Sequence, residues 1–245
     1  MSARATLATA RRVLAQLHRD PRTVAMLVVV PVVLLLLLRY VYDDQPQVFD
    51  RIGAPLLALF PFVTMFLVTS VAMLRERTTG TLERLLTTPL GRGDLLLGYA
   101  LAFGVVGVVQ TAVASAVALG LLGLDVAGSP SLVVLLAVLD ALLGMALGLL
   151  LSAFARSEFQ AVQFMPAVVL PQFLLCGLLI DRDAMAGVLR WLSDVLPLTY
   201  AVQGMQRVAA SSEVTSGLLT DLAVVVACVV IALVLGATTL QRRSE

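Results

Sequence analysis

The chain has 245 residues, of which 60% are apolar and only 13% are charged, with a formal net charge of +1. This charged share is about half of what a soluble domain carries, so we expect an all-α, polytopic membrane protein forming one domain over residues 1–245. Lysine is absent, which excludes a Walker P-loop, and a single histidine leaves too few ligands for a zinc site. We expect no metal, no cofactor in this chain, no catalytic residue and no nucleic-acid partner.

Residues 1–22 are expected to form an amphipathic helix that lies in the membrane interface. At 3.6 residues per turn, its apolar face carries Leu7, Ala10, Val13, Leu14 and Leu17. The opposite face carries Arg4, Arg11, Arg12 and Arg19. The alternative is a basic tail that only orients the chain in the membrane, but such a tail would not need the apolar face.

Six apolar segments of spanning length follow, since a membrane crossing needs about 20 residues. They cover residues 23–42, 54–74, 95–124, 131–154, 163–180 and 217–240. The fifth is short and is interrupted by Pro166 and Pro171. Twelve of the 17 basic residues lie on the side of the N-terminus and five on the other side. Positive residues favour the cytoplasmic side, so we expect both termini in the cytoplasm.

The segment between the second and third spans, residues 75–94, is predicted to hold a short cytoplasmic coupling helix. Gly80 and Thr81 can start a helix, Glu83 suits its first turn, and Pro89 ends it. Three leucines form an apolar ridge along it: Leu82, Leu85 and Leu86. A short helix with one apolar and one charged face suits a groove in a partner protein. The alternative is an ordinary solvated loop.

Small and polar residues within the spans predict close helix packing. Asp140, Gly144, Gly148 and Ser152 recur every four residues in the fourth span, and Gln110 lies beside a stripe of small residues in the third. A carboxylate inside a membrane is costly and marks a functional candidate. For Asp140 we expect a wet vestibule or a donor from a partner; a proton relay is the alternative.

Residues 181–208 are predicted to form an extracellular helical hairpin. Five apolar residues share one helical face: Val188, Trp191, Leu192, Val195 and Leu196. Trp191 is typical of a membrane-interface anchor, and Pro197 separates this helix from a second one. Together with the proline-broken fifth span, the segment indicates a partly re-entrant hairpin, which is tolerated where protein covers it.

Two groups of residues resemble the permeases of type-2 ATP-binding-cassette (ABC) exporters. The first group is Glu76, Gly80, Thr81, Leu82, Glu83, Thr88, Pro89, Leu90, Leu97 and Gly98. The second is Gly177, Trp191, Leu196, Pro197, Leu198, Thr199, Tyr200 and Arg207. Two positions and one short segment depart from the family pattern. Tyr99 stands where a lysine is usual, Thr78 where an acid is usual, and residues 181–184 replace a proline-rich turn.

The resemblance implies one half of a membrane core in a bacterial inner or plasma membrane. Two copies of a separate ABC ATPase, which carry ATP and Mg, would engage residues 78–90, and Glu76 belongs to the same coupling motif. A second permease, identical or paired, would face the first and fifth spans. Trp191, Pro197, Tyr200 and Arg207 would belong to an outer gate. The substrate would be amphipathic: a drug, an antibiotic, a lipid or glycolipid, or a polysaccharide precursor.

Three other functions are compatible with a polytopic helical protein. An intramembrane enzyme would need a nucleophile–base pair or a metal cluster, and the sequence shows no pattern for either. An ATP-independent channel or carrier would leave the leucine ridge without a purpose. A sensor or scaffold subunit that binds an ATPase without transporting usually carries a large external domain, whereas the external segments here are short.

Overall fold

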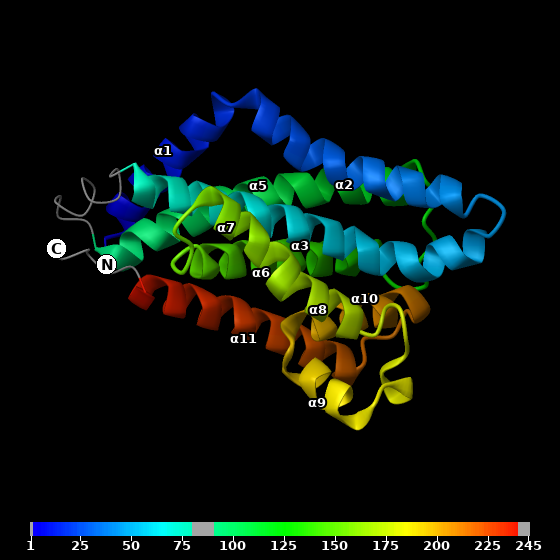
Figure 1. Ribbon diagram of the computed structural model, residues 1–245. Helices are drawn as coiled ribbons and strands as arrows, with labels where there is room; N and C mark the ends of the chain where they lie inside the picture. The colour runs from blue at the N-terminus through cyan, green and yellow to red at the C-terminus, as the bar shows by residue number, and fades with distance from the viewer. Residues whose placement is uncertain (1, 80–90, 240–245) are drawn as a thin grey trace.

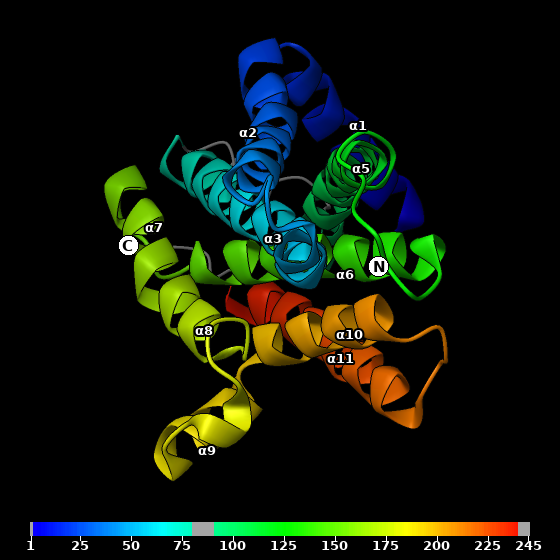
Figure 2. The same ribbon diagram turned by 90° about the vertical axis from the view of Figure 1, so that its right-hand side faces the viewer.

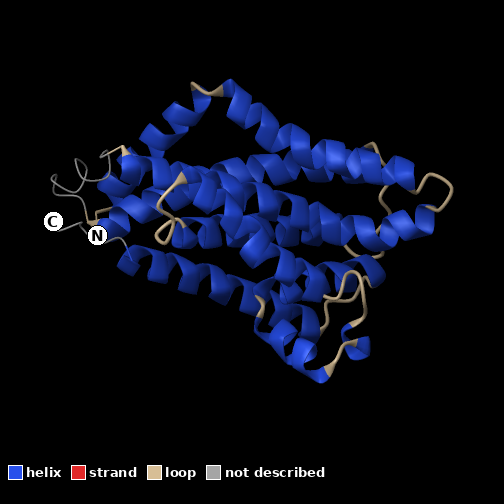
Figure 3. Cartoon of the chain, in the orientation of Figure 1, coloured by secondary structure: helices blue, strands red, loops and turns tan. Residues whose placement is uncertain are grey.

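The computed structural model describes residues 2–79 and 91–239, and every regular element within these ranges is helical (Figure 3). Helices long and apolar enough to cross a membrane are α2 (Pro21–Val41), α3 (Pro46–Thr78), α5 (Arg92–Gly120), α6 (Pro130–Leu151) and α11 (Ser216–Thr239). The all-α class predicted from the sequence is confirmed. In the part of the chain that the structure describes, five helices meet this criterion.

The remaining elements are shorter. They are α1 (Ala3–His18), α7 (Glu158–Phe164), the π-helical turn η1 (Met165–Val169), α8 (Leu170–Leu175), the 3₁₀ turn η2 (Arg182–Ala184), α9 (Gly187–Val195) and α10 (Pro197–Ala210). The fifth predicted span, 163–180, falls on η1, α8 and the end of α7. Pro166 lies in the π turn and Pro171 in the first turn of α8, because proline interrupts the regular α-helical hydrogen bonding. The six-span count stays a prediction.

Several helix ends differ from the predicted boundaries. Helix α3 begins at Pro46 rather than near residue 54, and α5 and α6 end at Gly120 and Leu151, before residues 124 and 154. Proline suits the first turn of a helix because its missing N–H is not needed there. With 33 residues, α3 is about 50 Å long at 1.5 Å per residue. It therefore extends beyond a hydrocarbon core of about 30 Å.

Helix α6 lies in the middle of the bundle (Figure 2). The helices α3 and α5 pack on one side of it, and α10 and α11 on the other. Helices α2 and α11 are peripheral and keep many apolar side chains exposed. Among these are Met26, Val29, Leu37, Val41, Leu219, Val230, Ile231 and Val234. Exposed apolar faces of this extent are covered by lipid or by another protein.

The two ends of the bundle differ in construction. At one end, the start of α1 and the end of α11 lie close to the end of α3 and the start of α5 (Figure 1). We call this the α1 end. At the other, α9 projects from the bundle beside α8 and α10; we call this the α9 end. Gly177, with φ of +89°, makes the turn that leads from α8 into this projection, in a backbone region that favours glycine.

Candidate functional site

Helix α1 is docked onto the first turns of α5. A Cβ atom at Gly98 would lie 2.5 Å from Thr9 Cβ and 3.0 Å from the Thr6 carbonyl oxygen, so the close approach of the two helices requires glycine here. Asp94, which is buried, accepts hydrogen bonds from the backbone N–H of Ser2 at 2.9 Å and from the Thr6 hydroxyl at 3.5 Å. The contact between α1 and α5 is therefore held by close packing at Gly98 and by hydrogen bonds at Asp94.

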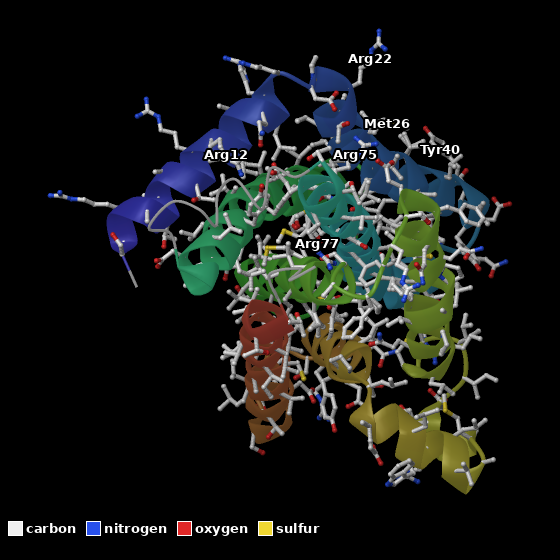
Figure 4. All side chains as sticks on the ribbon, turned by 60° about the vertical axis from the view of Figure 1, so that its left-hand side comes forward. Arg12, Arg22, Met26, Tyr40, Arg75 and Arg77 are labelled. Atoms are coloured by element: carbon white, nitrogen blue, oxygen red, sulfur yellow. The ribbon has the colours of Figure 1, made fainter. Side chains whose placement is uncertain are left out.

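Three side chains from α1, α3 and α5 meet beside this contact. The Arg12 guanidinium donates a hydrogen bond of 2.6 Å to the Tyr99 hydroxyl and lies 5.8 Å from the centre of the Tyr99 ring. Its Nη1 atom lies 3.6 Å from Glu76 Oε1. Figure 4 shows Arg12 on α1 where that helix faces α3 and α5. The charge pair and the cation–π contact hold the three helices together. We call Arg12, Glu76 and Tyr99 the junction.

The junction retains unused hydrogen-bonding capacity. Among the described residues, Arg12 Nε and Glu76 Oε2 are buried and have no hydrogen-bond partner. A buried polar atom without a partner costs free energy. A hydrogen bond to either atom, from a ligand or after a shift of one helix, would therefore stabilise the protein.

The end of α3 is tied to two further elements. Arg75 donates two hydrogen bonds to the Glu158 carboxylate of α7, at 2.7 and 3.0 Å. These bonds and the positive charge of Arg75 lower the pKa of Glu158 below its usual value. Arg77 donates to the carbonyl oxygen of Ser152 at 2.6 Å. The last turns of α3 are thus held by α1, α5, α7 and the end of α6.

The predicted coupling residues fall into two groups. Glu76 lies in the junction, with its side chain 13% exposed. The others lie outside the described residues: Gly80, Thr81, Leu82, Glu83, Leu85, Leu86 and Pro89. Helix α3 ends at Thr78, and Thr79 is the last described residue before this segment. Of the predicted coupling residues, Glu76 is therefore the one that lies in the part of the chain that the structure describes.

The polar face of α1 differs from the prediction at one position. Arg4, Arg11 and Arg19 are exposed, but Arg12 turns inward, where Glu76 offsets the burial of its charge. On the predicted apolar face, Leu7 is 62% exposed. The part of this helix that is buried against protein is centred on Thr9, Ala10 and Val13, and Leu14 packs against it partly buried. The rotation follows from the close contact at Gly98, which sets which residues of α1 point toward α5.

The two glycines of the fourth span lie against α3. A Cβ atom on Gly144 would overlap the Phe62 carbonyl group, and one on Gly148 would lie 2.5 Å from the Phe66 carbonyl oxygen. Thr69 strengthens the same contact, since its hydroxyl lies 3.2 Å from the carbonyl oxygen of Met145 on α6. Small residues allow helix backbones to approach this closely. Helices α3 and α6 therefore pack as one rigid pair.

The two polar residues predicted within the spans are both buried. Gln110 donates to the Thr64 hydroxyl at 2.5 Å and so links α5 to α3. Asp140 is 1% exposed, and neither of its carboxylate oxygens has a hydrogen-bond partner among the described residues. The described ranges therefore show no wet vestibule at Asp140, and a donor from a partner stays a prediction. The reason is the central position of α6, which is covered by helices on both sides.

The predicted outer-gate residues lie at the α9 end. Pro197 is the first residue of α10, and the Tyr200 hydroxyl donates to the Asp194 carbonyl oxygen at 2.7 Å. Trp191 is 67% exposed on α9, and its role as an interface anchor stays a prediction. Arg207 does not join them, because its Nε donates to Asp221 of α11 at 2.9 Å.

Sequence reasoning missed several of these partners. Asp221 lies inside the sixth predicted span, where a carboxylate needs a partner, and this signal could have pointed to Arg207. Asp94 precedes an apolar run, which is typical of an acid at a helix start. Tyr99 was noted only as a departure from the family pattern. Nothing local in the sequence indicates that it meets Arg12, 87 residues away.

Comparison with known proteins agrees with this helical membrane architecture. The family model described as ABC-2 type transporter matches residues 4–209. The "Probable multidrug ABC transporter permease YbhS" of Escherichia coli (strain K12) is 30% identical over 141 residues, which is 57% of this chain and 37% of that protein. The "Linearmycin resistance permease protein LnrN" of Bacillus subtilis (strain 168) is 27% identical over 153 residues, 62% of this chain and 39% of that protein.

A eukaryotic relative matches as well. The "ABC transporter G family member 20" of Dictyostelium discoideum is 29% identical over 167 residues, 68% of this chain and 23% of that protein. The matches thus span well under half the length of these relatives. Since the family model covers most of the sequence, the chain belongs to the ABC-2 type transporter family. It is a multi-pass membrane permease domain, and the family as a whole implies an ABC ATPase partner.

Proposed function

We propose that this chain is the transmembrane permease subunit of an ABC exporter, driven by ATP hydrolysis on a separate subunit. The observation that carries the proposal is the junction, in which Arg12, Glu76 and Tyr99 join α1, α3 and α5 immediately before the predicted coupling segment. Two ATPase subunits with ATP and Mg would bind two permeases, identical or paired. This chain itself would hold no cofactor. Both termini would lie in the cytoplasm of a bacterial cell, on the side of the α1 end.

The geometry suits the transmission of force from an ATPase. A partner that moves the predicted coupling segment, residues 78–90, pulls on the end of α3. The contacts from α3 to α1, α5 and α7 spread this displacement over several helices, and the tight α3–α6 contact carries it along the bundle. Packed helices move as rigid bodies and do not deform continuously.

The exposed apolar helices indicate where the other components would lie. In this proposal the exposed side of α2 and the α7–α8 segment face the second permease, and the translocation path runs between the two copies. The hairpin of α9 and α10 caps that path with Trp191, Pro197 and Tyr200. The substrate would be an amphipathic drug or antibiotic, a lipid or a glycan precursor. The names of two relatives, which mention multidrug transport and linearmycin resistance, support this class.

Two substitutions in the predicted coupling segment test the proposal. Leu85→Asp places an unpaired carboxylate in the docking face, which costs several kcal/mol when it is buried. We expect it to release the ATPase or to uncouple ATP hydrolysis from export. Glu83→Gln removes a charge worth about 0.5–1 kcal/mol at an exposed helix start, so its effect should be partial.

The measurement combines pull-down of the ATPase with substrate-stimulated hydrolysis in reconstituted membranes. Membrane insertion of each variant is checked by its resistance to carbonate extraction. If Leu85→Asp leaves both ATPase binding and stimulation unchanged, residues 78–90 do not form the coupling helix. If the wild-type chain transports without any ATPase, an ATP-independent carrier replaces the proposal. If it binds an ATPase but moves no substrate, a sensor or scaffold replaces it.

A further inference from the structure

A groove opens beside the junction, between the elbow that joins α1 to α2 and the last third of α3. Its volume is about 580 Å³, and Tyr99 and Phe103 of α5 form its floor. The walls come from α1, the start of α2, and α3 between Leu67 and Thr79. Apart from the Tyr99 and Glu76 side chains at one end, none of the groove belongs to the junction.

The groove changes from apolar to polar along α3. Leu67, Val68 and Val71 line its deep part, whereas Arg75 and Glu76 line the part near the end of the helix. From residue 67 to residue 76 the helix rises about 14 Å. This is close to half of a hydrocarbon core of about 30 Å. A lipid in the leaflet on the side of α1 has the same order, with its chain deep and its headgroup at the surface.

The charges at the polar end favour a ligand that donates hydrogen bonds. The Arg75 guanidinium is engaged by both oxygens of Glu158, while Glu76 Oε2 is buried and has no hydrogen-bond partner among the described residues. Asp20 also lines the groove. The Thr23 hydroxyl and N–H donate to its carboxylate, and these bonds lower the pKa of Asp20, so that it remains charged.

The outer side of the elbow carries the opposite charge. Arg19 and Arg22 flank Asp20 and are exposed, and Arg22 extends away from the helices (Figure 4). An ammonium group at the polar end of the groove would face Asp20 and Glu76. In a phospholipid the phosphate lies between the acyl chains and the ammonium, so Arg19 and Arg22 on the outer side would face the headgroups of surrounding lipids.

We propose that this groove binds an amphiphile with a primary ammonium headgroup, of the phosphatidylethanolamine type, from the leaflet on the side of α1. A phosphatidylglycerol has the phosphate but no ammonium. A phosphatidylcholine has a quaternary ammonium that donates no N–H hydrogen bond. The site needs neither ATP nor an ATPase, so its test is independent of the export proposal.

Tryptophan fluorescence with brominated lipids tests the site in the full chain. The only tryptophan is Trp191, so the Trp191→Phe variant has no tryptophan fluorescence of its own. Val71→Trp then places a probe on the groove wall. The variant is reconstituted into phosphatidylcholine vesicles that contain equal fractions of dibrominated phosphatidylethanolamine or dibrominated phosphatidylglycerol. We expect the ethanolamine lipid to bind about threefold more strongly, as one or two partly exposed charge contacts allow.

Two matched variants separate headgroup recognition from general lipid contact. Asp20→Asn removes the charge but keeps a good helix N-cap. In this variant the ratio of ethanolamine-lipid binding to glycerol-lipid binding should fall close to one. Val230→Trp on the exposed face of α11 reports ordinary lipid and should show no preference. If Val71→Trp folds poorly, Leu67→Trp replaces it.

Three results would overturn the proposal. Equal quenching by the two lipids at Val71→Trp means that the groove does not select a headgroup. Stronger quenching by the glycerol lipid means that Arg19 and Arg22 dominate. Absence of quenching by either lipid means that another protein surface covers the groove.

Discussion

The α1 end of the molecule and the segment that projects at the α9 end, residues 182–200, are held together by different kinds of contact. At the α1 end, Ser2 bonds to Asp94 across 92 residues, and Arg75 bonds to Glu158 across 83. Within residues 182–200, most side-chain contacts join residues that are close in sequence. Tyr200 and Asp194 are six residues apart, and Thr199 and Ser193 are also six apart.

This difference indicates how each end responds to force. Contacts between distant helices transmit a displacement of one helix to the others. Contacts within a hairpin preserve the shape of the hairpin but leave its position to be set by packing. Helix α9 packs only on its neighbours in sequence, α8, η2 and α10, among the element pairs with substantial contact in the described ranges. We therefore expect the α1 end to move as a unit and the α9 hairpin to move relative to the bundle.

The largest expected effect concerns which side of the membrane each end faces. Single cysteines replace Ser2, Asp44 or Ser244 in a background in which Cys176 and Cys228 are changed to alanine. An impermeant maleimide added to intact cells should label only the variant at position 44, because the arginine distribution predicts that both termini lie in the cytoplasm. Labelling at position 2 would reverse the assignment of the two ends. Lysed cells, in which all three variants should react, provide the control.

The contact that both ends share is the α3–α6 pair, and Gly148→Leu should disrupt it. The side chain would collide with the Phe66 carbonyl group, and we expect a loss of stability of about 3 kcal/mol or more. Gly187→Leu on α9 is the matched control, since nothing lies within 4 Å of a Cβ atom there. Gel filtration of the purified variants measures the folded fraction. Equal folded fractions for the two variants would show that the close α3–α6 contact does not contribute to stability.

Arg12→Ala and Arg190→Ala compare an ion pair from each end. Arg12 is partly buried with Glu76 and Tyr99, so its loss should lower stability by about 1–3 kcal/mol. Arg190 pairs with Asp183 at 3.0 Å, and both side chains are more than half exposed, so the expected loss is below about 1 kcal/mol. Thermal unfolding in detergent measures both. Arg12→Lys should recover only part of the stability, since lysine lacks the planar group that stacks on tyrosine. A larger effect at Arg190 would contradict the comparison.

The smallest effect is a pH dependence at Glu158. Its pKa is lowered from a usual value of 4.5 by Arg75, so the folded state binds this proton less readily than the unfolded state. The stabilisation is therefore complete above about pH 4.5 and disappears as the pH falls through the lower folded value. Because the Glu158 side chain is 51% exposed, we expect less than about 1 kcal/mol. The difference in thermal midpoint between the wild type and Glu158→Gln should shrink from pH 7 to pH 3.5. A difference in thermal midpoint that stays constant over this range would show that it does not arise from the charge pair of Glu158 with Arg75.

The sequence by itself determined the membrane class, the positions of five of the six predicted spans to within eight residues, and the helical character of residues 3–18. These properties depend on local hydropathy and on the 3.6-residue period, which any stretch of chain carries on its own. The two groups of family residues also predicted the ABC-2 relationship, which the family match at residues 4–209 confirmed.

Only the tertiary structure decided which polar groups meet. Arg12 looks like its neighbours Arg4, Arg11 and Arg19 in the sequence, but the contact at Gly98 rotates α1 and turns Arg12 toward Glu76 and Tyr99. Asp140 was expected near water, yet the central place of α6 buries it. Such partners are distant in the chain and are set by how the helices pack. The local pattern fixes which face of a helix is apolar, but not which neighbouring helix that face meets.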